Sequence, residues 1–157
     1  MEQTQPEVKQ QDEIEDTICV DESELTMYIF VNTTLGMGKG KIAGQVGHAA
    51  QYVTAKILRT GFDHIVKNHL SKILDPTYND SEVSPPDEYE RYMKWESGSK
   101  KVILKATQEE LLELQKLPES VSIYDAGRTQ IAPNSLTVVA FYPTSKLKDK
   151  FKDYALL

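Results

Sequence analysis

The sequence predicts an α/β fold: a single domain built on a four-stranded mixed β-sheet covered by helices. Its length of 157 residues fits one domain and is sufficient to bury a core. Strand-like and helix-like segments alternate in the order β-α-α-β-α-β-β, which predicts a sheet packed against helices. The last two strands are joined too closely for a crossover helix, so the sheet should be mixed.

The first half of the chain predicts an acidic tail, one strand and two helices. Residues 1–24 are polar and acidic without an apolar period, which is typical of a disordered tail. The β-branched and aromatic run Leu25–Asn32 predicts a buried strand that opens a domain spanning residues 25–157. A helix should run from Lys39 to about Thr60, with Gly61 as its C-terminal stop. A second helix should cover Asp63 to Leu74 and end before Pro76. The apolar stripe of the first helix comprises Ile42, Val46, Ala49, Ala50, Val53 and Ile57.

The second half predicts three more strands. An acidic insertion around residues 76–93 contains adjacent prolines and a short helix in "YERYMKW". A strand follows at Lys100–Ala106, and Thr107 with Glu110 forms a capping box for the next helix, which Pro118 stops. Further strands are expected at residues 120–125 and 136–142, before a short basic C-terminal helix or tail.

Charge is unevenly distributed along the chain. The formal net charge is -6, but residues 1–25 carry -8 and residues 75–96 carry -5, which leaves a body of +7. The overall acidity therefore does not exclude a nucleic-acid partner. The single cysteine, Cys19, rules out an internal disulfide framework and favours a cytoplasmic protein. No apolar run approaches the roughly 20 residues that a membrane span requires.

A glycine–lysine arch, "GMGKGK" at residues 36–41, opens the first long helix. Unpaired N–H groups at a helix start attract anions, and glycine admits a ligand close to the backbone. The arch fails the P-loop pattern, since Leu35 and Ile42 occupy required positions, and it fails the dinucleotide fingerprint because Lys41 replaces the third glycine. The arch therefore suits phosphate or a developing oxyanion, or is simply a flexible turn with solvated lysines.

Two polar side chains follow Lys41 along the same helix. Gln45 and His48 lie four and seven residues further on, close to one face. A histidine in this setting is more often structural than catalytic. His64 and His69 show no ligand partners, so a zinc site has little support.

The second polar constellation is "YDAGRTQIAPNSLT", residues 124–137, which follows a predicted strand. Its composition is that of an ordinary turn. Asp125 nevertheless lies at a strand end, where α/β folds commonly place functional groups. A lysine, an acid and a hydroxyl would meet if Lys41, Asp125 and Thr129 faced one another.

Both segments together, "GMGKGKIAGQVGHAA" and "DAGRTQIAPNSLT", resemble the signature blocks of the archaeal and eukaryotic peptidyl-tRNA hydrolase family, Pth2. The segment "SGSKKVILKATQEELLEL" also resembles that family's middle strand and helix. The resemblance implies helices on both faces of the sheet. It also implies a carboxylic ester hydrolase that releases peptide from the 3′ ribose of tRNA. The family's proposed catalytic lysine, acid and threonine fall on Lys41, Asp125 and Thr129.

The same resemblance, together with the basic residues, suggests how tRNA is bound. The expected contacts are Gly38, Lys39, Gly40, Gln45, His48, Lys100, Lys101, Arg128 and Thr137, although Lys100 and Lys101 also fit an ordinary exposed strand end. The resemblance implies no metal or other cofactor and a possible homodimer, and the acidic segments could recruit a protein. Gly36 and Ser99 replace a lysine and a glutamine of the family pattern. The alternative hypothesis is a paralogue that binds tRNA or protein without cleaving.

Overall fold

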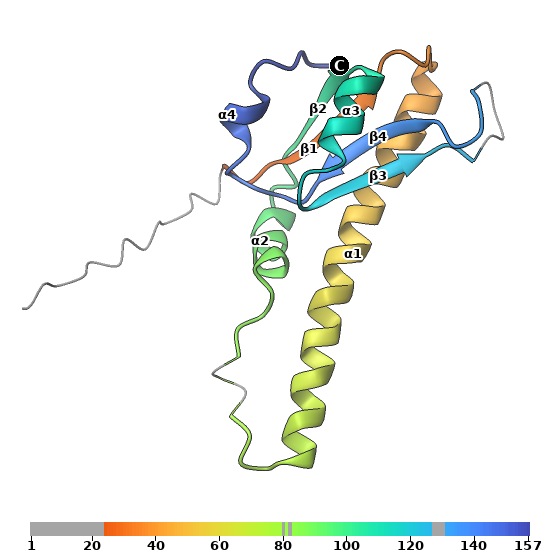
Figure 1. The fold of residues 1–157 in the computed structure, drawn as a ribbon. Coiled ribbons are helices and arrows are strands. Elements are labelled where there is room, and N and C mark those ends of the chain that lie inside the picture. Colours follow the sequence, from red (N-terminus) through yellow and green to blue (C-terminus); the bar gives the residue numbers. More distant parts are fainter. Residues whose placement is uncertain (1–23, 80, 82, 127–130) are drawn as a thin grey trace, which may run out of the picture.

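The computed structural model describes residues 24–79, 81, 83–126 and 131–157 (Figure 1). Within these ranges the elements are β1 (Met27–Asn32), α1 (Lys39–Leu74), α2 (Asp87–Glu96), β2 (Lys101–Ala106), α3 (Gln108–Leu114), β3 (Ser120–Tyr124), β4 (Leu136–Phe141) and α4 (Lys148–Phe151). The predicted α/β single domain is confirmed. The predicted acidic tail lies outside the described residues apart from Glu24.

The four strands form one mixed sheet in the order β2-β1-β4-β3. β1 and β2 are parallel, with Met27 opposite Lys101, whereas β4 runs antiparallel to both β1 and β3. This register brings the end of β1, the start of β4 and the end of β3 to the same end of the sheet. Val31 near the end of β1 pairs with Val138, and Tyr124 at the end of β3 pairs with Leu136. The loops that follow β1 and β3 therefore leave the sheet at the same end, with β4 between the two strands.

Apolar residues are buried on both faces of the sheet. On β1, Met27, Ile29 and Val31 belong to one core cluster, whereas Tyr28 and Phe30 belong to the other. Residues of α1 and α2 complete the first cluster, and residues of α3 and α4 complete the second. Helices therefore cover both faces, as expected (Figure 1). A strand buried on both sides explains why β1 is almost continuously apolar.

The prediction of two helices between Lys39 and Leu74 was wrong, because the structure has one continuous helix of 36 residues. Gly61, expected to end the first helix, lies buried within α1. A Cβ atom on Gly61 would collide with the ring of Tyr89, on α2. The glycine is therefore present for a close helix–helix contact rather than for a cap. At 1.5 Å per residue α1 is about 54 Å long and extends well beyond the sheet (Figure 1).

The short helix expected inside the acidic insertion is present as α2, and two side chains tie it to the sheet. The indole N–H of Trp95 donates a 2.8 Å hydrogen bond to the carbonyl of Lys100. Arg91 contacts Asp87, Glu119 and the carbonyl of Pro143. Burial alone would lower the pKa of the Arg91 guanidinium, but the two carboxylates outweigh burial and raise that pKa. Arg91 therefore remains charged and links α2 to the start of β3.

The C-terminal residues cover the exposed edge of the sheet. The N–H of Lys105 donates to the carbonyl of Ala155, and the N–H of Leu157 donates to the carbonyl of Ile103. An uncovered edge strand would present unpaired backbone groups, and these two hydrogen bonds pair some of the backbone groups of β2.

The predicted capping box of α3 is also confirmed, with Thr107 and Glu110 bonded reciprocally. Within the described residues no helix is long and apolar enough to cross a membrane.

Candidate active site

The glycine–lysine arch joins the end of β1 to the first turn of α1. Gly36 has a φ of 61°, in the left-handed region where a side chain would be strained. Gly38 is the N-cap of α1, and no side chain caps it and no acidic residue lies in the first turn. Gly38 and Gly40 have no atom within 4 Å of an added Cβ, so the backbone there is open to a ligand. The arch thus presents uncapped N–H groups to solvent, where an anion could bind.

The buried polar residue Asn32 holds the arch in place. Its amide nitrogen donates to Gln108 at 2.6 Å and to the carbonyl of Leu136 at 2.8 Å. Its amide oxygen accepts hydrogen bonds from the backbone N–H and the hydroxyl of Thr34, at 3.0 and 2.7 Å. Asn32 was not among the residues predicted from the sequence, although a polar side chain that ends an apolar strand was a signal that could have identified it.

Lys41, in the first turn of α1, forms an ion pair with Asp125, directly after β3. The two residues are 84 positions apart in the sequence. The Asp125 side chain is only 4% exposed and that of Lys41 21%, so the charges meet at the boundary between the core and solvent. A carboxylate this deeply buried needs a cation beside it. The structure thus brings together two of the three expected catalytic residues.

The backbone around Asp125 fixes the position of its carboxylate. The N–H of Asp125 donates to the carbonyl of Ser135 at 2.9 Å, and the N–H of Asn134 donates to the carbonyl of Asp125 at 2.8 Å. These two hydrogen bonds close the loop between β3 and β4 at its base. Thr129 and Arg128, expected at the site, lie in the part of this loop outside the described residues.

One helical turn below Lys41, Gln45 contacts Thr137 on β4. The Thr137 hydroxyl lies 2.9 Å from Gln45 Oε1 and 3.0 Å from the carbonyl oxygen of Ile123, on β3. Both side chains are buried, with Thr137 fully enclosed. Their polar atoms are used inside the protein, and they fix α1 against the strand that leads to Asp125.

The other residues predicted to contact tRNA lie at opposite ends of the sheet. Lys39 is exposed within the arch, and His48 is exposed on α1 about two helical turns after Lys41. Lys100 and Lys101 lie a strand length away, since Lys101 pairs with Met27 at the start of β1 whereas the arch follows its end. The ammonium group of Lys101 lies 4.8 Å from the centre of the Trp95 ring. The structure therefore does not bring Lys100 and Lys101 to the arch.

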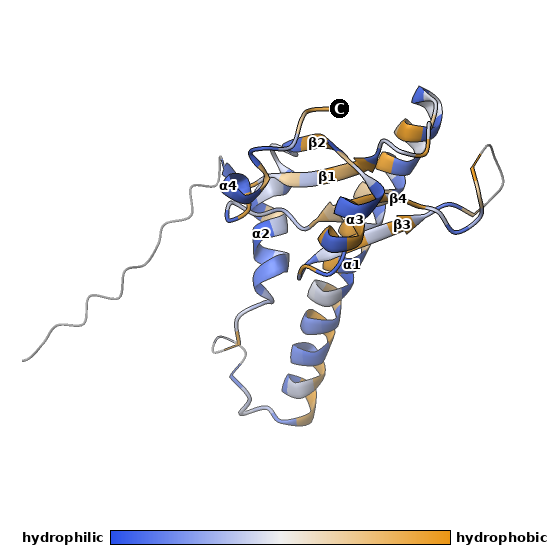
Figure 2. Cartoon of the chain, turned by 45° about the horizontal axis from the view of Figure 1, so that its top comes forward, coloured by the Kyte–Doolittle hydropathy of each residue, from blue (hydrophilic) through white to orange (hydrophobic). Residues whose placement is uncertain are grey.

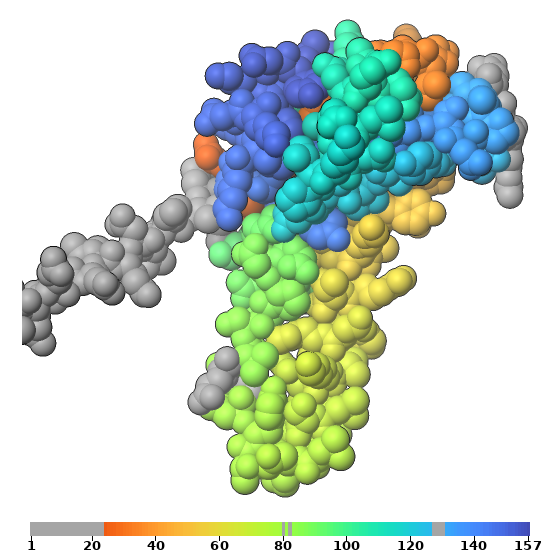
Figure 3. Space-filling model, in the orientation of Figure 1, coloured from red at the N-terminus to blue at the C-terminus, as the bar shows by residue number. Residues whose placement is uncertain are grey.

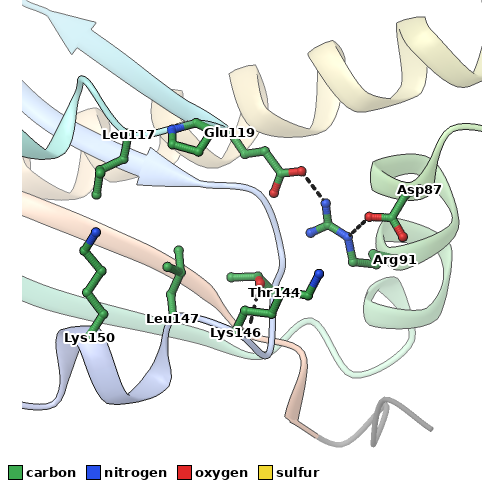
Figure 4. Close-up of a pocket in the computed structure, with 9 residues that line it drawn as sticks. Asp87, Arg91, Leu117, Glu119, Thr144, Lys146, Leu147 and Lys150 are labelled. Atoms are coloured by element: carbon green, nitrogen blue, oxygen red, sulfur yellow. Dashed lines mark hydrogen bonds and ion pairs between the residues drawn. The ribbon is translucent and has the colours of Figure 1, made fainter. Parts of the chain in front are cut away.

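A pocket at the far end of the sheet shows a different arrangement. Figure 4 shows Arg91 pointing between Asp87 and Glu119, with Lys150 on the opposite side of the pocket. Because the Arg91 guanidinium bonds to both carboxylates, it serves the packing of α2.

Within the described residues no group of three or more His, Cys, Asp or Glu side chains gathers to hold a metal ion.

Comparison with known proteins identifies relatives across almost all of the described chain. A family model described as peptidyl-tRNA hydrolase PTH2 matches residues 25–157. The human mitochondrial peptidyl-tRNA hydrolase 2 is 36% identical over 138 residues, which cover 83% of this chain and 62% of that protein. A peptidyl-tRNA hydrolase of Sulfurisphaera tokodaii is 35% identical over 134 residues, 79% of this chain and 90% of the relative. One of Methanococcus maripaludis is 37% identical over 139 residues, 82% of this chain and 96% of the relative.

Proposed function

Because the chain belongs to the PTH2 family of peptidyl-tRNA hydrolases, we propose that it cleaves the ester between a peptide and the 3′ ribose of tRNA. The observation that carries this proposal is the ion pair between Lys41 and Asp125, which lies beside an open backbone arch. A carboxylate and an ammonium group held together at the edge of the core are groups that ester hydrolysis can use. We place the reaction in the cytoplasm.

In the proposed mechanism Asp125 orients a water molecule and accepts its proton as the water oxygen attacks the ester carbonyl carbon. A tetrahedral oxyanion forms, and the charge of Lys41 stabilises it. The bond to the ribose oxygen then breaks, and the proton passes from Asp125 to that oxygen, which gives free tRNA and a peptide carboxylic acid that loses its remaining proton to solvent. Thr129 would help to position the water.

The tRNA is proposed to enter along the arch. The uncapped backbone at Gly38 and Gly40 suits a phosphate, exposed Lys39 lies between these glycines, and exposed His48 follows about two helical turns further along α1. Arg128 is proposed to add a further phosphate contact. Gln45 and Thr137 are assigned a positioning role, because their polar groups bond to each other inside the protein. Lys100 and Lys101 would reach only a more distant part of the tRNA.

The direct test is single-turnover hydrolysis of peptidyl-tRNA by the purified full chain. Wild-type protein should release peptide, whereas Asp125→Asn and Lys41→Ala should be strongly impaired. Asp149→Asn and Lys150→Ala are matched controls, because both side chains are exposed on α4, and they should retain full activity. A wild-type protein that binds tRNA without cleaving the ester would instead support the non-catalytic alternative.

A further inference from the structure

A cavity of ≈ 380 Å³ lies between α4, the start of β1 and the edge strand β2. This α4–β2 cavity is large enough for a small molecule. Its buried lining residues Tyr28, Leu104 and Phe151 belong to the core cluster under α3 and α4, so the cavity lies on the face of the sheet opposite α1. Figure 3 shows α4 and the residues after it, in dark blue, at the surface of the molecule.

The floor of the α4–β2 cavity is aromatic and aliphatic. Tyr28, Phe151 and Tyr154 line it, and the centre of the Phe151 ring lies 5.2 Å from that of Tyr28 and 6.1 Å from that of Tyr154. Leu156 also lines the cavity, and its bridge to Leu104 holds the C-terminal residues beside β2. In Figure 2 these last residues are hydrophobic, whereas the visible part of α4 is hydrophilic. The apolar floor is therefore formed before any ligand binds.

Three exposed lysines stand at the rim of the α4–β2 cavity. Lys148 begins α4, Lys152 directly follows α4, and Lys100 precedes β2. Glu24, the only acid among the described residues that line the cavity, pairs with Lys148 at 3.3 Å. Within the described part of the chain neither Lys100 nor Lys152 forms an ion pair. Three lysines and one glutamate leave the cavity with two positive charges that no carboxylate offsets.

We propose that the α4–β2 cavity binds a nucleoside phosphate, with the base on the aromatic floor and the phosphate among the lysines. A planar base packs well on aromatic and aliphatic side chains. Ammonium groups bind phosphate oxygens through charge-assisted hydrogen bonds. Phosphate alone would leave the apolar floor unused, and a nucleoside alone would leave the lysines unused. A free nucleotide and an unpaired nucleotide of an RNA present this same chemistry.

The α4–β2 cavity is separate from the proposed catalytic pair. Lys100 lies at the start of the β1–β2 pairing, whereas the arch follows the end of β1. The cavity is also on the face covered by α3 and α4, whereas Lys41 is carried by α1 on the other face. The proposal is independent of the proposed hydrolase activity, because nucleotide binding is measured without ester cleavage.

The first test is isothermal titration calorimetry of the full chain with AMP, adenosine and inorganic phosphate. AMP should bind at least about 10-fold more tightly than either of the other two, because only AMP contacts both the floor and the lysines. Equal affinity for AMP and inorganic phosphate would overturn the proposal. Absence of saturable AMP binding at concentrations up to about 5 mM would overturn it as well.

Lysine variants locate the bound nucleotide. Lys100→Ala and Lys152→Ala should each weaken AMP binding by about 5- to 10-fold, the scale for losing a charged hydrogen bond. Lys150→Ala is the matched control, exposed on α4 but outside the lining of this cavity, and should leave AMP binding unchanged. AMP binding that is lost in Lys39→Ala and unchanged in Lys152→Ala would place the nucleotide at the arch and overturn the proposal.

Fluorescence anisotropy with deacylated tRNA identifies the source of the nucleotide. If Lys152→Ala weakens both AMP and tRNA binding, and tRNA displaces AMP, the proposal holds with an unpaired nucleotide of the RNA as the ligand. If Lys152→Ala weakens AMP binding alone, the proposal holds with a free nucleotide as the ligand.

A matched pair of leucine variants tests whether the base contacts the floor. Leu156→Ala should weaken AMP binding by about 3-fold without changing the affinity for inorganic phosphate, because it removes apolar contact area only. Leu157→Ala is the control, exposed at the next position but outside the lining of the cavity, and should change neither affinity. Circular dichroism would show that each variant is folded. If Leu156→Ala leaves AMP binding as tight as in the wild type, the base does not lie on this floor and the proposal is overturned.

Discussion

The Thr137 hydroxyl on β4 lies 2.9 Å from the side-chain oxygen of Gln45 on α1, although the residues are 92 positions apart. Both side chains are buried. The contact lies one helical turn from Lys41, and Thr137 also bonds to the backbone of Ile123, two residues before Asp125. The elements that carry the lysine and the acid are therefore joined directly beneath the proposed catalytic pair.

Replacing Thr137 by valine removes this contact with little change of shape. It should lower the free energy of unfolding by about 1–3 kcal/mol, because the Gln45 amide is left buried without its partner. Turnover should fall as well, since Lys41 loses its fixed position. Urea unfolding and single-turnover hydrolysis would measure the two effects. Gln45→Leu combined with Thr137→Val should cost less than the sum of the single changes; strict additivity would show that the contact carries no energy.

Lys41 and Asp125 should behave as one catalytic unit. Asp125→Asn and Lys41→Ala should each reduce single-turnover hydrolysis about 100-fold or more, the scale for a positioned proton-transfer or oxyanion group. The double variant should be little worse than either single variant, because groups that act together are not additive. Wild-type rates in Asp125→Asn would exclude the proposed mechanism.

The sequence predicted the elements well where local signals decide them. The strands end within one or two residues of their expected bounds, and the capping box at Thr107 formed as expected. The residue pattern left open whether Lys41 and Asp125 meet, and only the family resemblance implied a shared site; the structure shows that the two residues form an ion pair. The position of Lys100 and Lys101 was not predictable, because strand register decides which end of the sheet they occupy.

Lys39 lies in the arch and Lys101 at the opposite end of the sheet, so replacing each lysine should affect the salt dependence of tRNA binding differently. Lys39→Ala should weaken binding and make the salt dependence shallower by roughly one unit, the loss of one phosphate contact. Lys101→Ala, at the opposite end of the sheet, is the matched comparison and should change the salt slope less. Fluorescence anisotropy at several salt concentrations would measure both slopes. Equal effects of the two substitutions would mean that the RNA-binding surface is not centred on the arch.

Gly61 shows why one error in the sequence analysis could not be avoided. A glycine after an apolar stripe predicts a helix end, and only the packing of α2 reveals that this glycine admits the Tyr89 ring. An isolated helix would gain stability from alanine at this position. The contact with Tyr89 therefore makes alanine at position 61 destabilising, although helix propensity alone would make it stabilising.

Gly61→Ala should consequently lower the free energy of unfolding by about 1–3 kcal/mol, the cost of overpacking a close contact. Gly44→Ala, on the same helix with no neighbour near the added Cβ, should instead raise it by up to about 1 kcal/mol. In a Tyr89→Ala background the ring is gone, so Gly61→Ala should become neutral or stabilising. Chemical denaturation of the four variants and the wild type would measure these differences. If Gly61→Ala stabilises the protein while Tyr89 is present, the helix must end or bend near residue 61 rather than pack closely against α2.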